Sequence, residues 1–182
     1  MDQNKLIIAI GGNIKSSDGI HPIDIGKKAI KLLENFLIFV EKKSCWYISD
    51  PIPISDQPKY FNSVIVARTS LNAFDVLNIL HKIENLLGRV RNKVNESRVI
   101  DLDLIDYSNK ILKKNNLVIP HPRAHLRRFV MEPLAELEPS WTHPILKINA
   151  NQILKKLNKQ DIKVFLDKNR DWFLIIIYIW TT

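Results

Sequence analysis

The sequence is poor in cysteine, in long apolar runs and in leader-like features, and each absence excludes a class of protein. Only Cys45 among 182 residues could form a disulfide, which excludes an internal disulfide framework and favours a reducing compartment. The conspicuous apolar run WFLIIIYIW at 172–180 is well short of the roughly 20 residues of a membrane-spanning helix. The start, MDQNKLIIAIGGN, lacks the basic residues, longer apolar segment and cleavage site of a signal peptide. We therefore expect a cytoplasmic protein without a membrane partner.

The charge balance is basic, with 27 lysines and arginines against 19 acidic residues and a formal net charge of +8. Such an excess favours polyanionic partners, either a nucleic acid or a polyphosphate. Many of the lysines are scattered among asparagine and isoleucine, as in LKKLNKQDIKV, which is typical of solvated surface. We therefore expect no nucleic-acid partner.

The apolar pattern predicts an α+β fold. The expected elements are a strand at 6–10, a helix at 21–36, strands at 37–48 and 60–68, a helix at 72–88 and a strand at 99–107. This β-α-β-β-α-β order is that of a ferredoxin-like antiparallel sheet with helices packed on one face. C-terminal additions follow: a hairpin at 110–120 and a third helix at 124–137, interrupted by Pro133.

Local signals refine these elements. Gly26 weakens the first helix, and Asn72 and Gly88 are a cap and a stop for the second. The apolar stripe expected on the second helix comprises Phe74, Leu77, Leu80, Ile83, Leu86 and Leu87. Between the second and third strands, SDPIPISDQPK contains three prolines and no periodicity, which predicts a long loop of the functional or disordered kind. We expect one domain over 1–158 and a tail of unknown role over 159–182.

The segment VIDLDLIDY places two carboxylates in an apolar strand. Because side chains alternate along a strand, Asp101 and Asp103 should share one face, about 6.5 to 7 Å apart. Ile100, Leu102 and Leu104 should face the core. Two such carboxylates can hold a hard cation, and Mg2+ completes its shell with phosphates and water. The alternative is a pair of exposed acids that form salt bridges with arginines.

Basic side chains surround this strand. Arg89, Arg91 and Arg98 flank a polar loop that leads to Asp101, where guanidinium groups could neutralise phosphate oxygens. Solvated loop charge is the alternative. Downstream, the segment PHPRAHLRRF contains His121 and His125, a spacing that can ligate zinc on a helix, although Pro122 opposes a regular helix there. A basic helix start that receives phosphate is the favoured interpretation.

These residues resemble the 6-hydroxymethyl-7,8-dihydropterin pyrophosphokinase family. The similarity runs in order through AIGGN, SDPIPISDQPKYFN, IENLLGRVRNKVNESRVIDLDLI and IPHPRAHLRRFVMEPLAEL to about Trp141, some three quarters of the chain. It implies transfer of the terminal diphosphate of ATP to the pterin alcohol in folate biosynthesis, with AMP as the second product. It also implies a monomer that acts on these two small molecules.

The resemblance assigns roles to the polar residues. It implies that Asp101 and Asp103 hold two Mg2+ ions between ATP and the acceptor hydroxyl, and that Arg98 binds phosphates and assists transfer with Arg89. The implied nucleotide-site residues are Glu84, Arg91, Arg98, His121 and Arg127. For the pterin, it implies an Asn62 hydrogen bond and stacking by Phe129. The implied remainder of that pocket comprises Ser49, Pro51, Ile52 and Tyr60.

Among several departures from the family pattern, the largest lies in the loop before the strand with the two aspartates. The family's W-x-P-R before the catalytic strand is here NESR, in a loop one residue shorter that lacks both tryptophan and proline. A degenerate, non-catalytic homologue is therefore one alternative. The other is an RNA-binding ferredoxin-like module, but neither YFNSVIVAR nor VIDLDLIDY fits its aromatic central strand.

Overall fold

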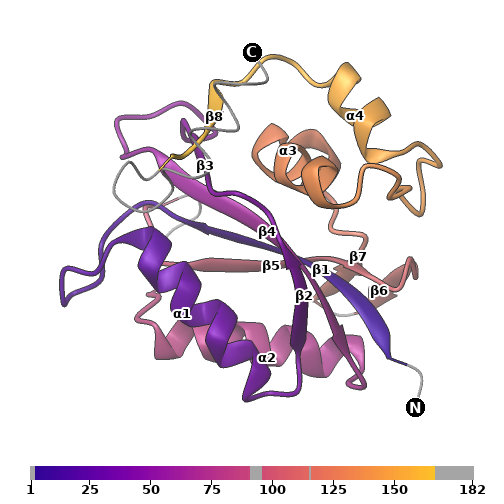
Figure 1. Cartoon of the computed structure of the whole chain (residues 1–182), viewed down its shortest axis with the longest axis horizontal. Coiled ribbons are helices and arrows are strands. Elements are labelled where there is room, and N and C mark those ends of the chain that lie inside the picture. Colours follow the sequence, from indigo (N-terminus) through magenta and orange to yellow (C-terminus); the bar gives the residue numbers. More distant parts are fainter. Residues whose placement is uncertain (1–2, 91–95, 115, 167–182) are drawn as a thin grey trace.

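The computed structural model describes residues 3–90, 96–114 and 116–166 (Figure 1). Its strands are β1 (Asn4–Gly12), β2 (Phe39–Lys43), β3 (Tyr47–Ser49), β4 (Tyr60–Thr69), β5 (Asp101–Tyr107), β6 (Leu112–Lys114), β7 (Leu117–Ile119) and β8 (Ile162–Val164). Its helices are α1 (Pro22–Glu34), α2 (Ala73–Leu86), a 3-10 turn η1 (Ala124–Leu126), α3 (Arg128–Leu137) and α4 (Ala150–Lys156).

One antiparallel sheet organises the molecule, with the strand order β5-β1-β4-β3-β8 and β2 also paired with β4. The predicted ferredoxin-like arrangement is confirmed. The single strand expected at 37–48 is wrong, because it consists of β2 and β3. The break falls at Ser44, whose side-chain Oγ accepts the Val64 N–H in place of a strand carbonyl.

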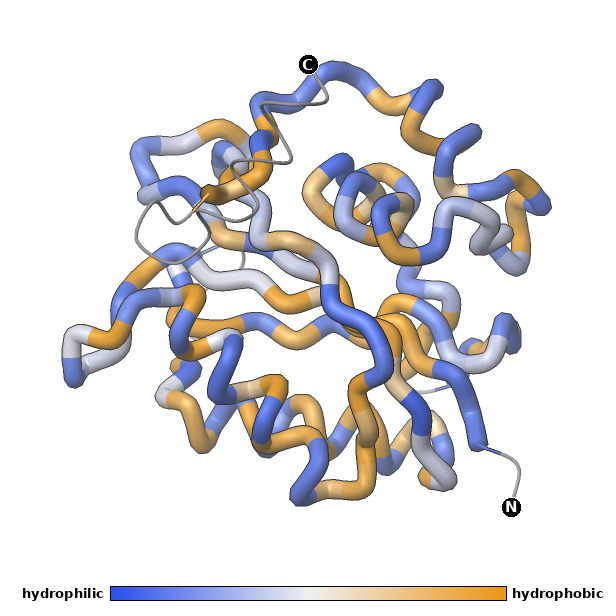
Figure 2. Tube along the Cα trace, viewed as in Figure 1, coloured by the Kyte–Doolittle hydropathy of each residue, from blue (hydrophilic) through white to orange (hydrophobic). Residues whose placement is uncertain are grey.

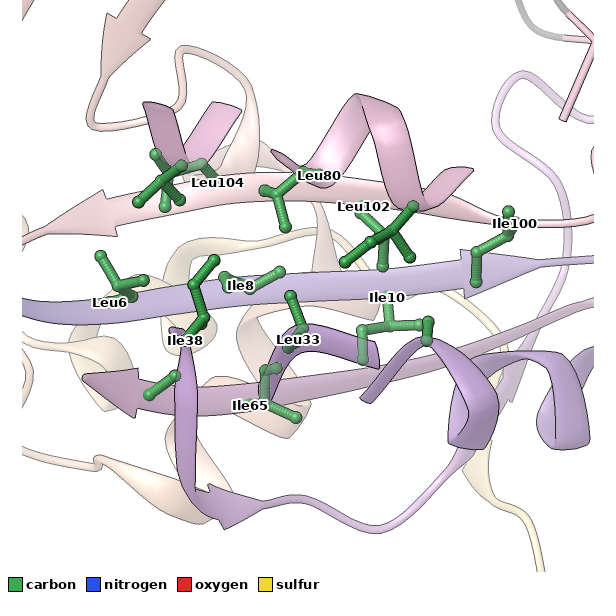
Figure 3. Packing of buried hydrophobic residues seen from close by; sticks show 14 of the residues in the cluster. Leu6, Ile8, Ile10, Leu33, Ile38, Ile65, Leu80, Ile100, Leu102 and Leu104 are labelled. Atoms are coloured by element: carbon green, nitrogen blue, oxygen red, sulfur yellow. The ribbon is translucent and has the colours of Figure 1, made fainter. Parts of the chain in front are cut away.

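The sheet is apolar on both faces. Leu6, Ile8 and Ile10 of β1 pack with α1 and α2, as Figure 3 shows for Leu33 and Leu80. The opposite face packs against α3 and α4 through Ile7, Val64 and Ile105. The prediction that the helices occupy one face therefore holds only for α1 and α2. Residues 6–10 of β1 and 64–67 of β4 are apolar without interruption, so alternate side chains supply an apolar layer to each face of the sheet. Along the helices, blue and orange residues are mixed, as expected of helices with one apolar side (Figure 2).

Helix α1 begins as predicted, with Pro22 in its first turn and the His21 Nδ1 accepting the Ile23 N–H. Gly26 is buried, and a Cβ at this position would lie 2.3 Å from the Trp46 ring. Trp46 is itself buried against the sheet. Gly26 therefore permits the close packing of α1 on Trp46.

Gly26→Ala is expected to lower the free energy of unfolding by about 1 to 3 kcal/mol, because the added methyl forces a buried ring to move. Helix propensity alone would give the opposite sign, since alanine is the better helix former. Thermal or denaturant unfolding measures the difference. Lys28→Ala on the exposed side of α1 is the control and should change stability little. A Gly26→Ala protein as stable as the parent would contradict the packing argument.

Helix α2 has the predicted ends. The Asn72 Oδ1 accepts the N–H groups of Phe74 and Asp75, and Gly88 has a φ of +87° just past the helix. The predicted burial of Leu86 is wrong, because this side chain is 61% exposed. The buried stripe runs instead through Ala73, Val76, Leu80, Ile83 and Glu84.

The C-terminal part adds to both faces of the sheet. The predicted hairpin is β6 and β7, and the predicted third helix begins only at Arg128, because Ala124–Leu126 form η1. Pro133 lies inside α3 and is buried rather than ending the helix. Strand β8 pairs with β3, while the apolar run at 172–180 lies outside the described residues. Within the described ranges, no helix combines the length and apolar character needed to cross a bilayer.

Candidate active site

A cavity of about 560 Å³ opens at one end of the sheet. Its walls are β1, β5, the loop between β3 and β4, the residues before β5, and the start of α3. The predicted site residues that line it are Ser49, Pro51, Ile52, Tyr60, Asn62, Arg89, Arg98, Asp101, Asp103, Arg127 and Phe129. Segments far apart in the sequence thus contribute to one pocket.

The two aspartates lie as the strand alternation predicts. Ile100, Leu102 and Leu104 are buried in the core, while Asp101 and Asp103 face the cavity. Asp101 is opposite Gly11 and Asp103 is opposite Ala9 on β1. These two neighbours are small, so the strand beside the carboxylates offers little bulk to cover them.

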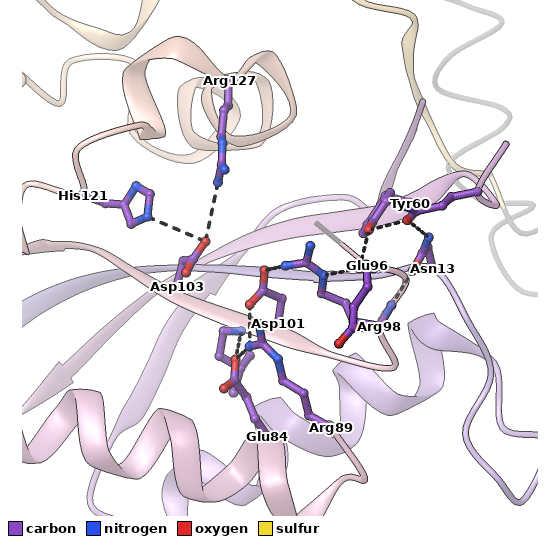
Figure 4. A network of polar contacts seen from close by, with 12 residues as sticks. Asn13, Tyr60, Glu84, Arg89, Glu96, Arg98, Asp101, Asp103, His121 and Arg127 are labelled. Carbon is purple, nitrogen blue, oxygen red and sulfur yellow. Dashed lines mark hydrogen bonds and ion pairs between the residues drawn. The ribbon is translucent and has the colours of Figure 1, made fainter. Parts of the chain in front are cut away.

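Asp101 is paired with arginines in this structure (Figure 4). The Arg98 Nη1 lies 2.6 Å from its Oδ2 and the Arg89 Nη1 lies 2.5 Å from its Oδ1. Arg89 also contacts the buried Glu84 carboxylate. In this structure Asp101 therefore forms the salt bridges with arginines that were the alternative to a metal site. These salt bridges hold both guanidinium groups at the cavity wall.

Asp103 has weaker partners. The nearest basic side chains are Arg127, with its Nη1 at 3.8 Å, and His121, with its Nε2 at 3.9 Å. Desolvation, followed by repulsion from Asp101, raises the pKa of Asp103 to about 6. Burial, followed by repulsion from Arg127 and Arg123, lowers the pKa of His121 to about 4, so this ring is neutral at pH 7. Asp103 is thus a carboxylate whose charge is poorly compensated.

Asp103→Asn is expected to raise the melting temperature by a few degrees at pH 7 in buffer with a chelator. A raised pKa means that the folded state binds the proton more tightly than the unfolded state, so ionisation costs stability as pH rises from about 4 to 6. The difference should vanish below about pH 3, where the carboxyl group is protonated in both the folded and the unfolded protein. Unfolding curves across this pH range provide the measurement, with Asp18→Asn on an exposed loop as control. A destabilised Asp103→Asn protein at pH 7 would contradict the assigned environment.

The acidic pair fits a hard divalent cation. Two carboxylates face one cavity, and a bound cation would offset the desolvation and the repulsion from Asp101 that raise the pKa of Asp103. Within the described part of the chain, no group of three or more His, Cys, Asp or Glu side chains gathers around a point. Other ligands would therefore come from water and substrate oxygens, as Mg2+ prefers.

The histidine pair does not form a zinc site in the described residues. The His121 ring is directed toward Asp103, whereas the His125 ring packs edge-on against His143 with a centroid distance of 5.0 Å. Pro122 follows His121, and His125 lies in the 3-10 turn η1 rather than in a helix that includes His121, so the i,i+4 helical geometry does not arise.

The other wall of the cavity suits a flat heterocycle. Asn62 is buried, and its Nδ2 donates to the Ser49 Oγ at 3.0 Å. Phe129 lies at the start of α3, where the Arg127 guanidinium sits 5.5 Å from its ring centroid. Tyr60 faces Arg98 in a similar contact at 5.8 Å. Aromatic faces with a directed amide are a common arrangement for ring recognition.

Two predicted nucleotide-site residues, Glu84 and His121, do not line the cavity. Glu84 is buried beneath it, where its Oε1 accepts the Leu102 N–H at 2.7 Å and contacts Arg89. His121 lies beside Asp103, with its Nε2 3.9 Å from the Asp103 Oδ2 (Figure 4). Arg91 lies outside the described residues. The positions of Glu84 and His121 suit side chains that orient Arg89 and Asp103.

Polar residues that the sequence alone did not single out complete the site. Gln57 lines the cavity, while Asn13 and Ser97 lie against it. The Asn13 side-chain Oδ1 accepts the Arg98 backbone N–H at 2.8 Å, and the Asn13 backbone N–H donates to the Arg98 carbonyl. The only sequence signals were the GGN turn and the polar, proline-rich loop, neither of which specifies these contacts.

Comparison with known proteins gives consistent matches. The family model "7,8-dihydro-6-hydroxymethylpterin-pyrophosphokinase (HPPK)" matches residues 7–139. The "Folic acid synthesis protein fol1" of Pneumocystis carinii is 34% identical over 93% of this chain, which spans 23% of that protein. The "2-amino-4-hydroxy-6-hydroxymethyldihydropteridine pyrophosphokinase" of Bacillus subtilis (strain 168) is 35% identical over 74% of this chain and 78% of its own length.

A solved structure has the same fold. The crystal structure of a Plasmodium falciparum HPPK-DHPS variant with pterin and p-hydroxybenzoate superposes with a TM-score of 0.66 and 15% identity. The match covers 85% of this chain and 44% of that one.

Proposed function

Since the chain belongs to the 7,8-dihydro-6-hydroxymethylpterin-pyrophosphokinase family, we propose that it transfers the diphosphate of ATP to 6-hydroxymethyl-7,8-dihydropterin in folate biosynthesis. The products are AMP and the pterin diphosphate. One observation supports this activity above others: a single cavity joins an acidic pair and arginines on one side to an aromatic and amide wall on the other.

The acidic side is assigned to the nucleotide. Asp101 and Asp103 would hold Mg2+, which when bound neutralises phosphate charge and lowers the pKa of a coordinated hydroxyl. Arg89 and Arg98, which now pair with Asp101, would then be released to contact phosphate oxygens. Arg127, less than 4 Å from Asp103, is placed to do the same. Catalysis would consist mainly of positioning and charge neutralisation.

The aromatic side is assigned to the pterin. Phe129 and Tyr60 provide ring faces, and Asn62, oriented by Ser49, provides directed hydrogen bonds. Pro51 and Ile52 close the same wall from the loop between β3 and β4. This wall would hold the hydroxymethyl oxygen for attack on the β-phosphorus of ATP, with AMP as the leaving group. The neutral His121 and the buried Glu84 would orient the polar groups around the reaction.

A coupled assay for AMP tests the proposal. The protein is incubated with ATP, Mg2+ and 6-hydroxymethyl-7,8-dihydropterin, and AMP and pterin diphosphate should form in equal amounts. Omission of the pterin, or addition of a chelator, should abolish AMP formation. Absence of AMP with all components present would favour the degenerate homologue. Neither alternative function is favoured by an observation on the described residues. The monomeric state, the cytoplasmic location and the boundary at 158 remain predictions.

A further inference from the structure

A cluster of polar side chains joins three loops at the rim of the cavity. Asn13 follows β1, Gln57 lies in the loop between β3 and β4, and Ser97 precedes β5. The Ser97 Oγ donates to the Gln57 Oε1 at 3.1 Å and accepts from the Asn13 Nδ2 at 3.3 Å. The same Gln57 oxygen accepts from the Tyr60 hydroxyl at 3.2 Å. Ser97 thus contacts both of the other loops through one hydroxyl.

The Ser97 hydroxyl lies behind the cavity wall rather than in it. Gln57, Tyr60, Glu96 and Arg98 line the cavity, whereas Ser97 does not. A group in this position can act on a substrate only through the residues that it holds. A residue without a side-chain hydroxyl could make neither of the two contacts.

Arg98 and the loop between β3 and β4 do not depend equally on the Ser97 hydroxyl. The Arg98 backbone is held by Asn13 at both its N–H and its carbonyl, and its guanidinium is held by Asp101. Contacts at this end of the loop between β3 and β4 include that of Ser97 with Gln57, beside those of the Asn13 Nδ2 with Pro58 and Gln57 and of the Tyr60 hydroxyl with Gln57. None of the three Arg98 contacts uses the Ser97 hydroxyl, whereas one of the loop contacts does. Loss of the hydroxyl should therefore loosen the loop more than it loosens Arg98.

We propose that Ser97 is a positioning residue, whose hydroxyl fastens the loop between β3 and β4 through Gln57 and thereby sets the pterin wall. The inference rests on the proposed function, because it assigns this wall to the pterin. The loop carries Pro51 and Ile52 and leads into Tyr60, so its order governs the surface that the heterocycle meets. Fixing a binding loop before the ligand arrives lowers the entropy cost of binding.

Ser97→Ala is expected to raise the KM for the pterin roughly three- to tenfold, the effect of losing one hydrogen bond. The KM for ATP and kcat should stay within about twofold, because Arg98 keeps its other contacts. Ser97→Thr retains the hydroxyl and should restore the pterin KM. Ser17→Ala, which removes an exposed hydroxyl from another loop, is the matched control and should change neither constant.

A double-mutant cycle with Gln57→Leu tests whether Ser97 acts on the pterin wall through Gln57. If Ser97 acts through Gln57, Ser97→Ala should add little to the effect of Gln57→Leu. Fully additive effects would overturn the proposal, as would a pterin KM in Ser97→Ala within twofold of the parent. A loss of kcat with both KM values unchanged would also overturn it. If the proposed function itself is wrong, the parent protein will form no AMP. If only the role of Ser97 is wrong, the parent protein will form AMP and the Ser97→Ala results will differ from those expected.

Discussion

Replacement of Asp101 or Asp103 by alanine is expected to reduce AMP formation by at least about a thousandfold, because each change removes half of the carboxylate pair assigned to Mg2+. A metal ion contributes several kcal/mol of charge stabilisation in phosphoryl transfer, and about 1.4 kcal/mol is tenfold in rate. The loss should appear in kcat, since the pterin wall is untouched by either substitution.

The two variants differ in their effect on the contacts of Arg89 and Arg98. Asp101→Ala removes the shared partner of Arg89 and Arg98, whereas Asp103→Ala leaves those contacts in place. Equal loss in both would therefore point to the cation rather than to the arginine contacts. Asp18→Ala, on an exposed loop, controls for a general effect of removing an acidic side chain. Rates in Asp101→Ala and Asp103→Ala near that of the parent would remove the metal assignment.

Arg98→Ala is expected to lower kcat by about a hundredfold or more, because a fixed donor aimed at developing phosphate charge typically has this effect. The Arg98 guanidinium lies between the Tyr60 ring and the Asp101 carboxylate, so it faces both halves of the cavity. Steady-state rates with saturating ATP, Mg2+ and pterin measure the change.

The geometry of the guanidinium can be separated from its charge. Arg98→Lys retains the charge but cannot reproduce the planar, forked set of donors, so it should recover only a small part of the lost rate. Arg68→Ala is the matched control, since Arg68 is an arginine on β4 that pairs with Glu41 at the surface. Full activity in Arg98→Lys would show that a point charge is sufficient, and full activity in Arg98→Ala would remove Arg98 from the mechanism.

Local signals determined most of the secondary structure. The apolar run of β1, the stop at Gly88 and the Asn72 cap are set by neighbouring residues, and each was predictable. The same is true of the shared face of Asp101 and Asp103, because side-chain alternation follows from strand geometry alone. The resemblance supplied the expected roles, and most of the residues that it named line one cavity.

Only the tertiary structure decided how these segments meet. Strand pairing and packing join residues that are distant in sequence, and no local pattern specifies which side chain will be the partner of another. Sequence periodicity could not place α3 on the face opposite α2, turn Leu86 to solvent or divide the strand at Ser44. Nor could it show that Asp101 is held by two arginines while the charge of Asp103 is poorly compensated. Burial and the distances to neighbouring charged groups determine how far each carboxylate is compensated, and both depend on the tertiary structure.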